Sequence, residues 1–405
     1  MHKNILDGIT VLDFTQVIAG PACTRLMAEL GAEVIKVELA PGGDMARGLP
    51  ELRDGRSGYF CQHNQGKQSL CLDLRDPRGL ALIEELMAKV DVLVENFSPG
   101  AITRLGLGWD AVHALNPKTI MCSISAFGQA GPLRDLPGFD YIAQAYSGAT
   151  SVIGPADGPP SVTGLAVGDV GTAMTALAAI NGALFHRLRS GGGGQYLDIS
   201  LIDFYLHAHE VNLESTSLTG RPPQRAGSHH PAVAPLGIFR ARGGDLMIVA
   251  LDPMWPRLCR AMARPELERD PRFRDAPARL ANRDALVTEI ESWLQRLPDA
   301  ETALARLQAE RVPVAPVLRV DEVLRHPHML ERGSVRTLDD PVLGTFQVSG
   351  NPLRFSAVDQ QLPPRAPFLG EHNRAILRRH LGLTDAALDN LEADEVLRAE
   401  TLPAP

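Results

Sequence analysis

The sequence lacks the features that would place it in an export pathway, in a membrane or on a nucleic acid. Its five cysteines, an odd number, form no C-x-x-C pair and have no partners at zinc spacing, so we expect reduced thiols, a cytoplasmic protein and no metal site. The amino-terminus has no apolar signal region, and no stretch approaches about 18 apolar residues, which predicts no membrane partner. Acidic residues outnumber basic ones by 48 to 40, and the net charge of −8 argues against nucleic acid as a partner.

The composition is that of a globular enzyme with substantial cores. Hydrophobic residues make up 44% of the 405 positions and charged residues 22%. This length predicts two or three domains.

Residues 1–200 alternate β-type and helical patterns, which is typical of a parallel sheet covered by helices. Proline at the start of one helix and apolar residues on a single face of another support the helical assignments. The predicted strands are 8–14, 32–38, 69–74, 91–95, 119–125 and 195–200, and the predicted helices are 21–30, 76–90 and 169–190.

The composition changes near residue 220, where turn-forming residues dominate. We interpret 1–200 as the amino-terminal part of a large domain, 201–224 as a linker, 225–325 as a small domain, and 326–405 as a return to the large domain. Within the small domain the pattern predicts a hairpin around Gly243 and Gly244, helices at 283–296 and 300–310, and a strand at 312–318.

Two glycine-containing stretches resemble nucleotide sites but lack the required spacing. Gly20 is followed by Pro21 and Ala22, so the G-x-G-x-x-G pattern is absent and we expect no NAD. The glycine run 191–194 follows a helix and precedes a strand, the reverse of a phosphate loop, which predicts a helix end. The adjacent His229 and His230 have no third ligand at a suitable spacing and predict no metal.

Asp169, in the sequence VGDVGTAM, stands at the start of a predicted helix. An aspartate there is typical of a helix N-cap. However, Gly168 and Gly171 would allow close approach of a ligand, and the helix amino-terminus favours negative charge at the same place. The residues alone leave two interpretations, a cap and a carboxylate nucleophile, and a free-peptide pKa of about 3.9 would keep the nucleophile ionised.

Several segments together carry a specific family resemblance, from about residue 6 to beyond residue 355. The chain resembles the family III CoA-transferases, the group of formyl-CoA transferase and carnitine CoA-transferase, which is related to the α-methylacyl-CoA racemases. The resemblance implies an α/β fold with a Rossmann-like large domain built from both chain ends, a smaller α+β domain and an interlocked homodimer. The segments are LDFTQVIAGPACTRLMAELGAEVIKVE, PGGDMAR, LVENFSPGAITRLGLG, SISAFGQAGP, PGFDYIAQA, GDVGTAM and GQYLDISL.

The resemblance implies a covalent mechanism with coenzyme A as co-substrate. The catalytic aspartate of the family falls on Asp169, which would attack an acyl-CoA to give a mixed anhydride and then an aspartyl-CoA thioester. Carried over residue by residue, the CoA contacts are Val17, Ala19, Leu72, Asn96, Phe97 and Arg104, with Lys67 as a further cation. Positions near the acyl group match Gln16, Arg47 and Tyr59.

Two departures from the family pattern narrow the activity. Racemase relatives have a proton-carrying histidine in the segment that corresponds to PGFD, where this chain has Phe139. Phenylalanine cannot carry a proton, so racemisation of a 2-methylacyl-CoA is disfavoured and is kept as the alternative function. The glycine-rich loop of formyl-CoA transferase is absent, and GSHHPAVAP occupies its place, which weighs against oxalate or formate.

Substrate choice follows from the cationic residues. Arg47 with His229 or His230 could pair with a distal carboxylate, which favours succinyl-CoA as donor and malate, citramalate, mesaconate or itaconate as acceptor. A CoA-binding protein without catalysis remains a third hypothesis.

Overall fold

A computed structural model describes residues 4–358 and 365–402 and divides the chain into two compact units. The first unit comprises Met1–Ser147, Gly164–Ala208 and Pro327–Pro405, and the second comprises Gly148–Thr163 and His209–His326. The predicted small domain, 225–325, therefore lies within the second unit. The segment Gly148–Thr163, which the sequence pattern assigned to the large domain, also belongs to the second unit.

A six-stranded parallel sheet forms the centre of the first unit. Its order is β5-β2-β1-β6-β7-β8, so the strand order reverses between β1 and β6, as in doubly wound sheets. Leu12 of β1 lies between Ile35 of β2 and Leu93 of β6. Most strands are buried along their length because helices cover both faces. The strands are β1 (Thr10–Asp13), β2 (Glu33–Leu39), β5 (Gln68–Leu72), β6 (Val92–Glu95), β7 (Ile120–Ser125) and β8 (Tyr196–Ser200).

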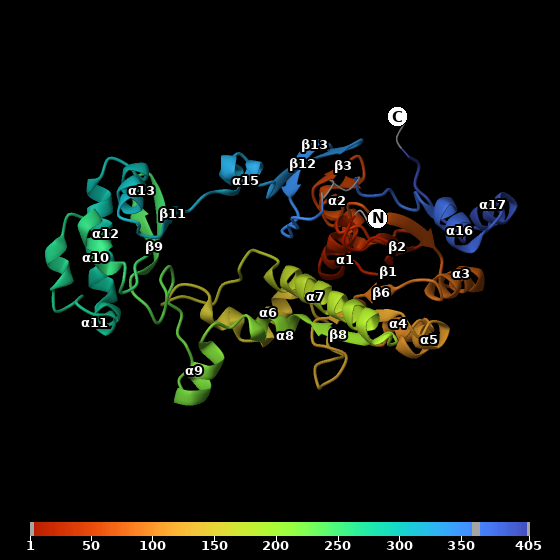
Figure 1. Ribbon diagram of the computed structural model, residues 1–405, viewed down its shortest axis with the longest axis horizontal. Helices are drawn as coiled ribbons and strands as arrows, with labels where there is room; N and C mark the ends of the chain where they lie inside the picture. Colours follow the sequence, from red (N-terminus) through yellow and green to blue (C-terminus); the bar gives the residue numbers. More distant parts are fainter. Residues whose placement is uncertain (1–3, 359–364, 403–405) are drawn as a thin grey trace. The chain divides into compact units, whose positions relative to one another are not determined.

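Helices α1 (Ala19–Glu29) and α7 (Val167–Ser190) lie on one side of the strands, and α3 (Pro77–Met87), α5 (Trp109–Leu115) and α16 (Asn373–Leu381) lie on the other (Figure 1). Helix α3 shows how the sequence sets these elements. Asp76 accepts a hydrogen bond from the amide of Arg78 and caps the helix, Pro77 begins it, and Ile83 and Leu86 are fully buried. Because α16 belongs to the carboxyl-terminal segment, that segment also contributes to the helices that cover the sheet.

Helix α7 is long and apolar enough, by length and composition, to cross a membrane. The core helix of a globular protein satisfies the same criteria. Here α7 packs on α1, on α8 (Leu201–His207) and on β7, and it ends at Gly191, whose φ of 61° is left-handed. The glycine run after α7 therefore terminates the helix, as the sequence predicted.

The second unit has its own core around a three-stranded antiparallel sheet of order β11-β10-β9. Trp255, Phe273 and Trp293 are its largest buried aromatic residues. Its elements are η2 (Ala149–Val152), α9 (Asn212–Thr219), β9 (Leu236–Ala241), β10 (Gly244–Val249), α10 (Trp255–Ala261), η3 (Pro265–Glu268), α11 (Ala276–Ala281), α12 (Arg283–Arg296), α13 (Ala300–Ala309), β11 (Val314–Pro316) and α14 (Val320–Val323).

The sequence pattern did not predict the hairpins of the first unit. In each hairpin one strand is largely exposed, and the other buries the charged residues Arg56, Arg336 and Asp340, so the apolar alternation is weak. The remaining elements are η1 (Met45–Gly48), β3 (Leu52–Arg53), β4 (Arg56–Ser57), α2 (Gly58–His63), α4 (Ala101–Arg104), α6 (Asp140–Tyr146), α15 (Pro327–Glu331), β12 (Val335–Asp340), β13 (Gly344–Ser349) and α17 (Asp385–Ala393).

Gly171→Ala tests the close packing of α7 against α8. A β-carbon at Gly171 would lie 1.9 Å from the ring of Phe204, so we expect this variant to lower the free energy of unfolding by about 1–3 kcal/mol. Gly182→Ala on the same helix is the control, because its β-carbon meets no atom within 4 Å and should stabilise by about 0.5–1 kcal/mol. Urea unfolding measures both. Equal effects of the two substitutions would contradict this packing.

Candidate active site

A cavity of about 270 Å³ lies at the carboxyl ends of the central strands of the first unit. Residues Gln16–Ala19 follow β1, Asn96–Pro99 follow β6, and Ile124–Phe127 end and follow β7, and all of them line it. Asp169 of α7 lines the same cavity. This is the place where open α/β sheets bind ligands, because the loops diverge where the strand order reverses.

Asp169 is the third residue of α7, and Ala166 occupies the N-cap position. Asp169 is therefore not the helix cap that its position suggested. Burial and the charge of Asp140 raise the pKa of Asp169 to about 7, well above the free-peptide value expected from the sequence. Near neutral pH the side chain is thus divided between its acid form and the nucleophilic anion.

Asp140, the first residue of α6, positions the backbone of Asp169 through hydrogen bonds. Its carboxylate accepts a hydrogen bond from the Tyr205 hydroxyl and, at 3.3 Å, another from the backbone amide of Asp169. The amide of Gly168 donates to the Tyr205 oxygen at 3.1 Å. A β-carbon at Gly168 would lie 2.4 Å from both Asp140 and Tyr205. Gly168 therefore leaves room for Asp140 and Tyr205, and its role in ligand approach stays a prediction.

Two loops of the cavity are joined by a reciprocal pair of hydrogen bonds. The backbone amide of Gln16 donates to the side-chain oxygen of Asn96 at 2.7 Å, and the Asn96 side-chain nitrogen donates to the Gln16 carbonyl at 2.8 Å. Asn96 thus holds the β1 loop against the β6 loop.

The structure brings six of the thirteen residues predicted for CoA and substrate to one cavity. Phe97 is half-buried there, and Phe139, which is 68% exposed, offers an apolar ring. In the lining as the structure describes it there is no histidine. The predicted residues that line the cavity with Asp169 are Gln16, Val17, Ala19, Asn96, Phe97 and Phe139.

Two further predicted residues lie outside this lining. Arg104 ends α4 and is exposed, and its guanidinium lies over Gly100. Tyr59 of α2 lines a separate cavity of about 480 Å³ with Phe346 and Leu343. Burial and the charge of Asp169 raise the pKa of the Tyr59 hydroxyl to about 12, so Tyr59 lies within the electrostatic reach of Asp169.

The structure gives three other predicted contacts a structural role. Lys67 is buried, and its ammonium group binds Asp13 at 2.9 Å. The Leu72 side chain is fully buried in the core of the sheet. Arg47 pairs with Glu38 through two hydrogen bonds of 2.7 and 2.8 Å and lies over the ring of Phe60. Each of these side chains thus has partners within the protein, and their predicted contacts with CoA or the acid stay predictions.

The two predicted histidines have partners within the second unit. The ring of His229 packs edge-on against Phe239, and burial with the charge of Arg283 lowers its pKa. The His230 ring nitrogen Nε2 lies 3.3 Å from a carboxylate oxygen of Glu210. Arg47, by contrast, belongs to the first unit. The predicted grouping of these residues around one substrate carboxylate is thus not visible within either unit.

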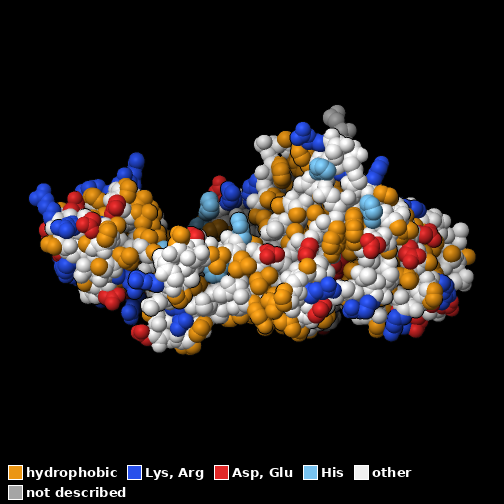
Figure 2. Space-filling model, turned by 90° about the horizontal axis from the view of Figure 1, so that it is seen from below, with side chains coloured by type: hydrophobic (Ala, Val, Ile, Leu, Met, Phe, Trp, Pro, Cys, Tyr) orange, Lys and Arg blue, Asp and Glu red, His pale blue; other side chains and the backbone are white. Residues whose placement is uncertain are grey.

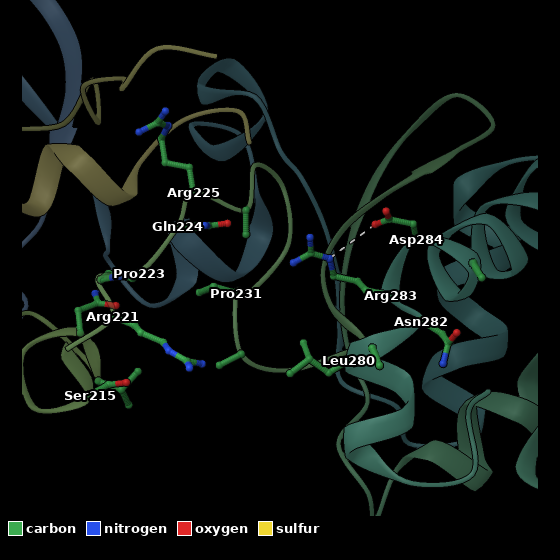
Figure 3. A pocket seen from close by; sticks show the side chains of 16 residues that line it. Ser215, Arg221, Pro223, Gln224, Arg225, Pro231, Leu280, Asn282, Arg283 and Asp284 are labelled. Atoms are coloured by element: carbon green, nitrogen blue, oxygen red, sulfur yellow. Dashed lines mark ion pairs between the residues drawn. The ribbon is translucent and has the colours of Figure 1, made fainter. Parts of the chain in front are cut away.

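A larger cavity, of about 660 Å³, lies wholly within the second unit (Figure 3). Arg225 lines it but donates to the carbonyl oxygens of Ser151, Pro155 and Gly158. Among the described residues of its lining, Asp284 is the sole acid, and it faces Arg283 across 3.8 Å (Figure 3). This cavity offers no buried carboxylate comparable to Asp169.

Sequence reasoning missed several residues of the Asp169 cavity. Arg134 is a cationic residue of the lining, and Asp140, outside the lining, accepts a hydrogen bond from the backbone amide of Asp169. The acid in PGFDYIAQA was a visible signal for Asp140, but nothing in the sequence joined it to Tyr205. The other missed lining residues are Ile18, Met45, Ser98, Pro99, Ile124, Ser125, Ala126, Phe127, Leu136, Gly138 and Leu201. Within the described ranges, no group of three or more His, Cys, Asp and Glu side chains is arranged to hold a metal ion.

The chain matches the family described as CoA-transferase family III over residues 6–373. It is 38% identical over 383 residues to the succinyl-CoA:mesaconate CoA-transferase of Haloarcula hispanica, which covers 92% of this chain and 95% of that relative. It is 36% identical over 397 residues to the succinyl-CoA–D-citramalate CoA-transferase of Chloroflexus aurantiacus, which covers 97% and 98% respectively.

A solved structure agrees with these matches. The crystal structure of a CAIB/BAIF family protein from Brucella suis superimposes with a TM-score of 0.82 and 33% identity, covering 93% of this chain and all of that one. Both the sequence and the parallel-sheet fold thus match across most of the chain, and the protein belongs to the family III CoA-transferases.

Proposed function

We propose that this enzyme moves CoA from succinyl-CoA to a small dicarboxylic acid, and that Asp169 is its covalent nucleophile. The observation that carries the assignment of the nucleophile is the placement of Asp169 at the start of α7, in one cavity with the loops that follow β1 and β6. A carboxylate suits this exchange, because donor, acceptor and enzyme all present the same acid group to the thioester.

The exchange proceeds through two acyl intermediates on Asp169. The Asp169 carboxylate attacks the thioester carbonyl, and the C–S bond breaks to release CoA thiolate and leave a mixed anhydride. The thiolate then attacks the Asp169 carbonyl, which forms an aspartyl-CoA thioester and frees the donor acid. The acceptor carboxylate reverses both steps. The partial positive charge at the amino-terminal end of α7 stabilises the negative charge that develops on the reacting oxygens.

Two relatives support the choice of substrates. Their names give succinyl-CoA as donor and mesaconate or D-citramalate as acceptor, both dicarboxylic acids. Arg134 is the cation in the cavity lining, and although its Nε lies 3.2 Å from Asp135, the pair is exposed, so we take Arg134 as our candidate for the negative charge of the substrates. Phe139 cannot carry a proton between the faces of an α-carbon, which disfavours the racemase alternative.

We also propose a cytoplasmic, interlocked homodimer. Apolar side chains remain exposed on α7, where Phe185 is 60% exposed and Leu188 is 81% exposed. Figure 2 shows hydrophobic side chains on the face that is seen from below. A second copy of the chain would remove such surface from water. The five cysteines are free and buried, which suits a reducing compartment.

Hydroxylamine trapping tests the nucleophile. With succinyl-CoA and hydroxylamine, we expect mass spectrometry to find a hydroxamate on the peptide that carries Asp169, and no adduct in the isosteric Asp169→Asn variant. An adduct on another residue, or one that persists in the variant, would show that Asp169 is not the nucleophile. Transfer from the trapped state only to monocarboxylic or aromatic acids would contradict the dicarboxylate assignment.

The pH dependence of the first half-reaction tests the environment of Asp169. Because only the anion attacks, we expect kcat/KM for the acyl-CoA to rise with pH and to level off above about pH 7. Asp140→Asn removes the neighbouring negative charge, so its inflection should move to lower pH, although burial will hold it above the ordinary aspartate value. Glu85→Gln is the control. Glu85 is an exposed residue of α3, so its substitution should leave the inflection in place. An unchanged inflection in Asp140→Asn would refute this electrostatic coupling.

Light scattering tests the dimer. We expect the parent protein to have twice the mass of one chain, and Phe185→Glu with Leu188→Glu to yield monomers, because two charges would be buried without partners. Leu115→Glu, on an exposed position of α5, should remain dimeric. A monomeric parent protein would remove the homodimer from the proposal.

A further inference from the structure

The turn between β1 and α1 contains a residue in a strained backbone conformation. Val17 has a φ of 68°, in the left-handed region that β-branched residues rarely adopt. Val17 lines the Asp169 cavity, together with Gln16 before it and Ile18 and Ala19 after it. Such a conformation persists only when the surrounding structure holds it.

Side chains bind consecutive backbone groups of this turn. The amide of Thr15 donates to the Asp13 carboxylate at 2.9 Å. Asn96 binds both the amide and the carbonyl of Gln16. The next two contacts come from Lys36 of β2, which donates to the Thr15 carbonyl at 2.7 Å, and from Asp44, whose Oδ1 accepts the Val17 amide at 3.1 Å.

Lys36 and Asp44 form a buried ion pair beneath the turn. Their charged atoms are 2.8 Å apart, Lys36 is 0% exposed and Asp44 is 3% exposed. Burial alone would lower the pKa of Lys36, but the carboxylates of Asp44 and Asp13 outweigh it and raise the pKa, so the ammonium group stays charged. Asp44 Oδ1 also accepts the amide of Ala46 at 2.9 Å, which fixes the turn that brings Met45 to the cavity.

The energetics of this pair point to a positioning role. Burying two charges costs desolvation energy, and apolar residues of similar size would often fill such a space with equal or greater stability. What apolar residues cannot supply is a donor for the Thr15 carbonyl and an acceptor for the Val17 amide. Both bonds end on backbone that lines or adjoins the cavity.

We propose that Lys36 and Asp44 are positioning residues for CoA transfer, which hold the Thr15–Val17 turn in its strained conformation and so set the wall of the cavity that contains Asp169. The proposal rests on the assignment of that cavity as the transfer site. The pair acts through the turn and does not touch the reacting atoms. Loss of the two bonds should therefore lower kcat more than it changes the KM for the acyl-CoA.

Two double variants separate the hydrogen bonds from the charges. Lys36→Met with Asp44→Leu removes the charges and both bonds to the turn. Lys36→Met with Asp44→Asn also removes the charges, but its amide oxygen can still accept the Val17 and Ala46 amides. We expect the first variant to lose at least about tenfold in kcat with a KM for succinyl-CoA within about threefold of the parent, and the second to recover most of that loss.

Hydrogen exchange gives a readout that does not depend on turnover. The Val17 amide should exchange faster in the Leu-containing variant and at nearly the parental rate in the Asn-containing variant. Glu29→Gln is the control. Glu29 lies at the carboxyl-terminal end of α1 and forms a buried ion pair with Arg336, which this substitution weakens. It should lower the melting temperature and leave kcat unchanged.

The outcomes distinguish this proposal from the proposed function. Folded variants that both keep the parental kcat would overturn the positioning role, and equal losses in the two would overturn it for Asp44, because both variants lack the bond from Lys36 to Thr15. A parent protein that transfers no CoA would instead overturn the proposed function, and the exchange rate of the Val17 amide would still show whether the pair holds the turn.

Discussion

The reversal of strand order between β1 and β6 is the constraint on which the rest of the site depends. Neighbouring strands on either side of this point send their connections to opposite faces of the sheet, so no single helix covers both carboxyl ends. Asn96 bridges the two ends through its paired hydrogen bonds with Gln16. The opening that remains is the cavity to which α7 brings Asp169.

The same neighbours that place Asp169 also set its charge. Burial raises the pKa of the Asp169 carboxyl, and the charge of Asp140, which accepts a hydrogen bond from the Asp169 backbone amide, raises it further. The amino-terminal end of α7 favours the anion and opposes both effects. A carboxylate that titrates near neutrality is still partly ionised at pH 7 and is more basic than a free aspartate, which suits a group that must attack a thioester.

The buried charges around the sheet explain why several plausible ligand contacts are structural. Lys67 neutralises Asp13, Arg47 neutralises Glu38, and Lys36 neutralises Asp44, and each pair is almost fully buried. Removing one partner would leave an uncompensated charge in the interior, at a cost of about 3–5 kcal/mol. A cation that meets a carboxylate inside the fold has a structural role, and the sequence alone does not show which carboxylate it meets.

The sequence by itself determined the βα pattern, the end of α7 at the glycine run and the identity of Asp169 as the informative acid. These follow from local periodicity, local turn chemistry and contiguous motifs, all of which are written along the chain. Only the tertiary structure decided that Asp140 and Tyr205 support Asp169, that Lys67 and Arg47 are internal, and that Val17 is held in a left-handed turn. Each of these depends on residues far apart in sequence whose contacts, burial and desolvation exist only after the sheet has formed, because a pKa or a hydrogen bond is a property of the surroundings and not of the residue.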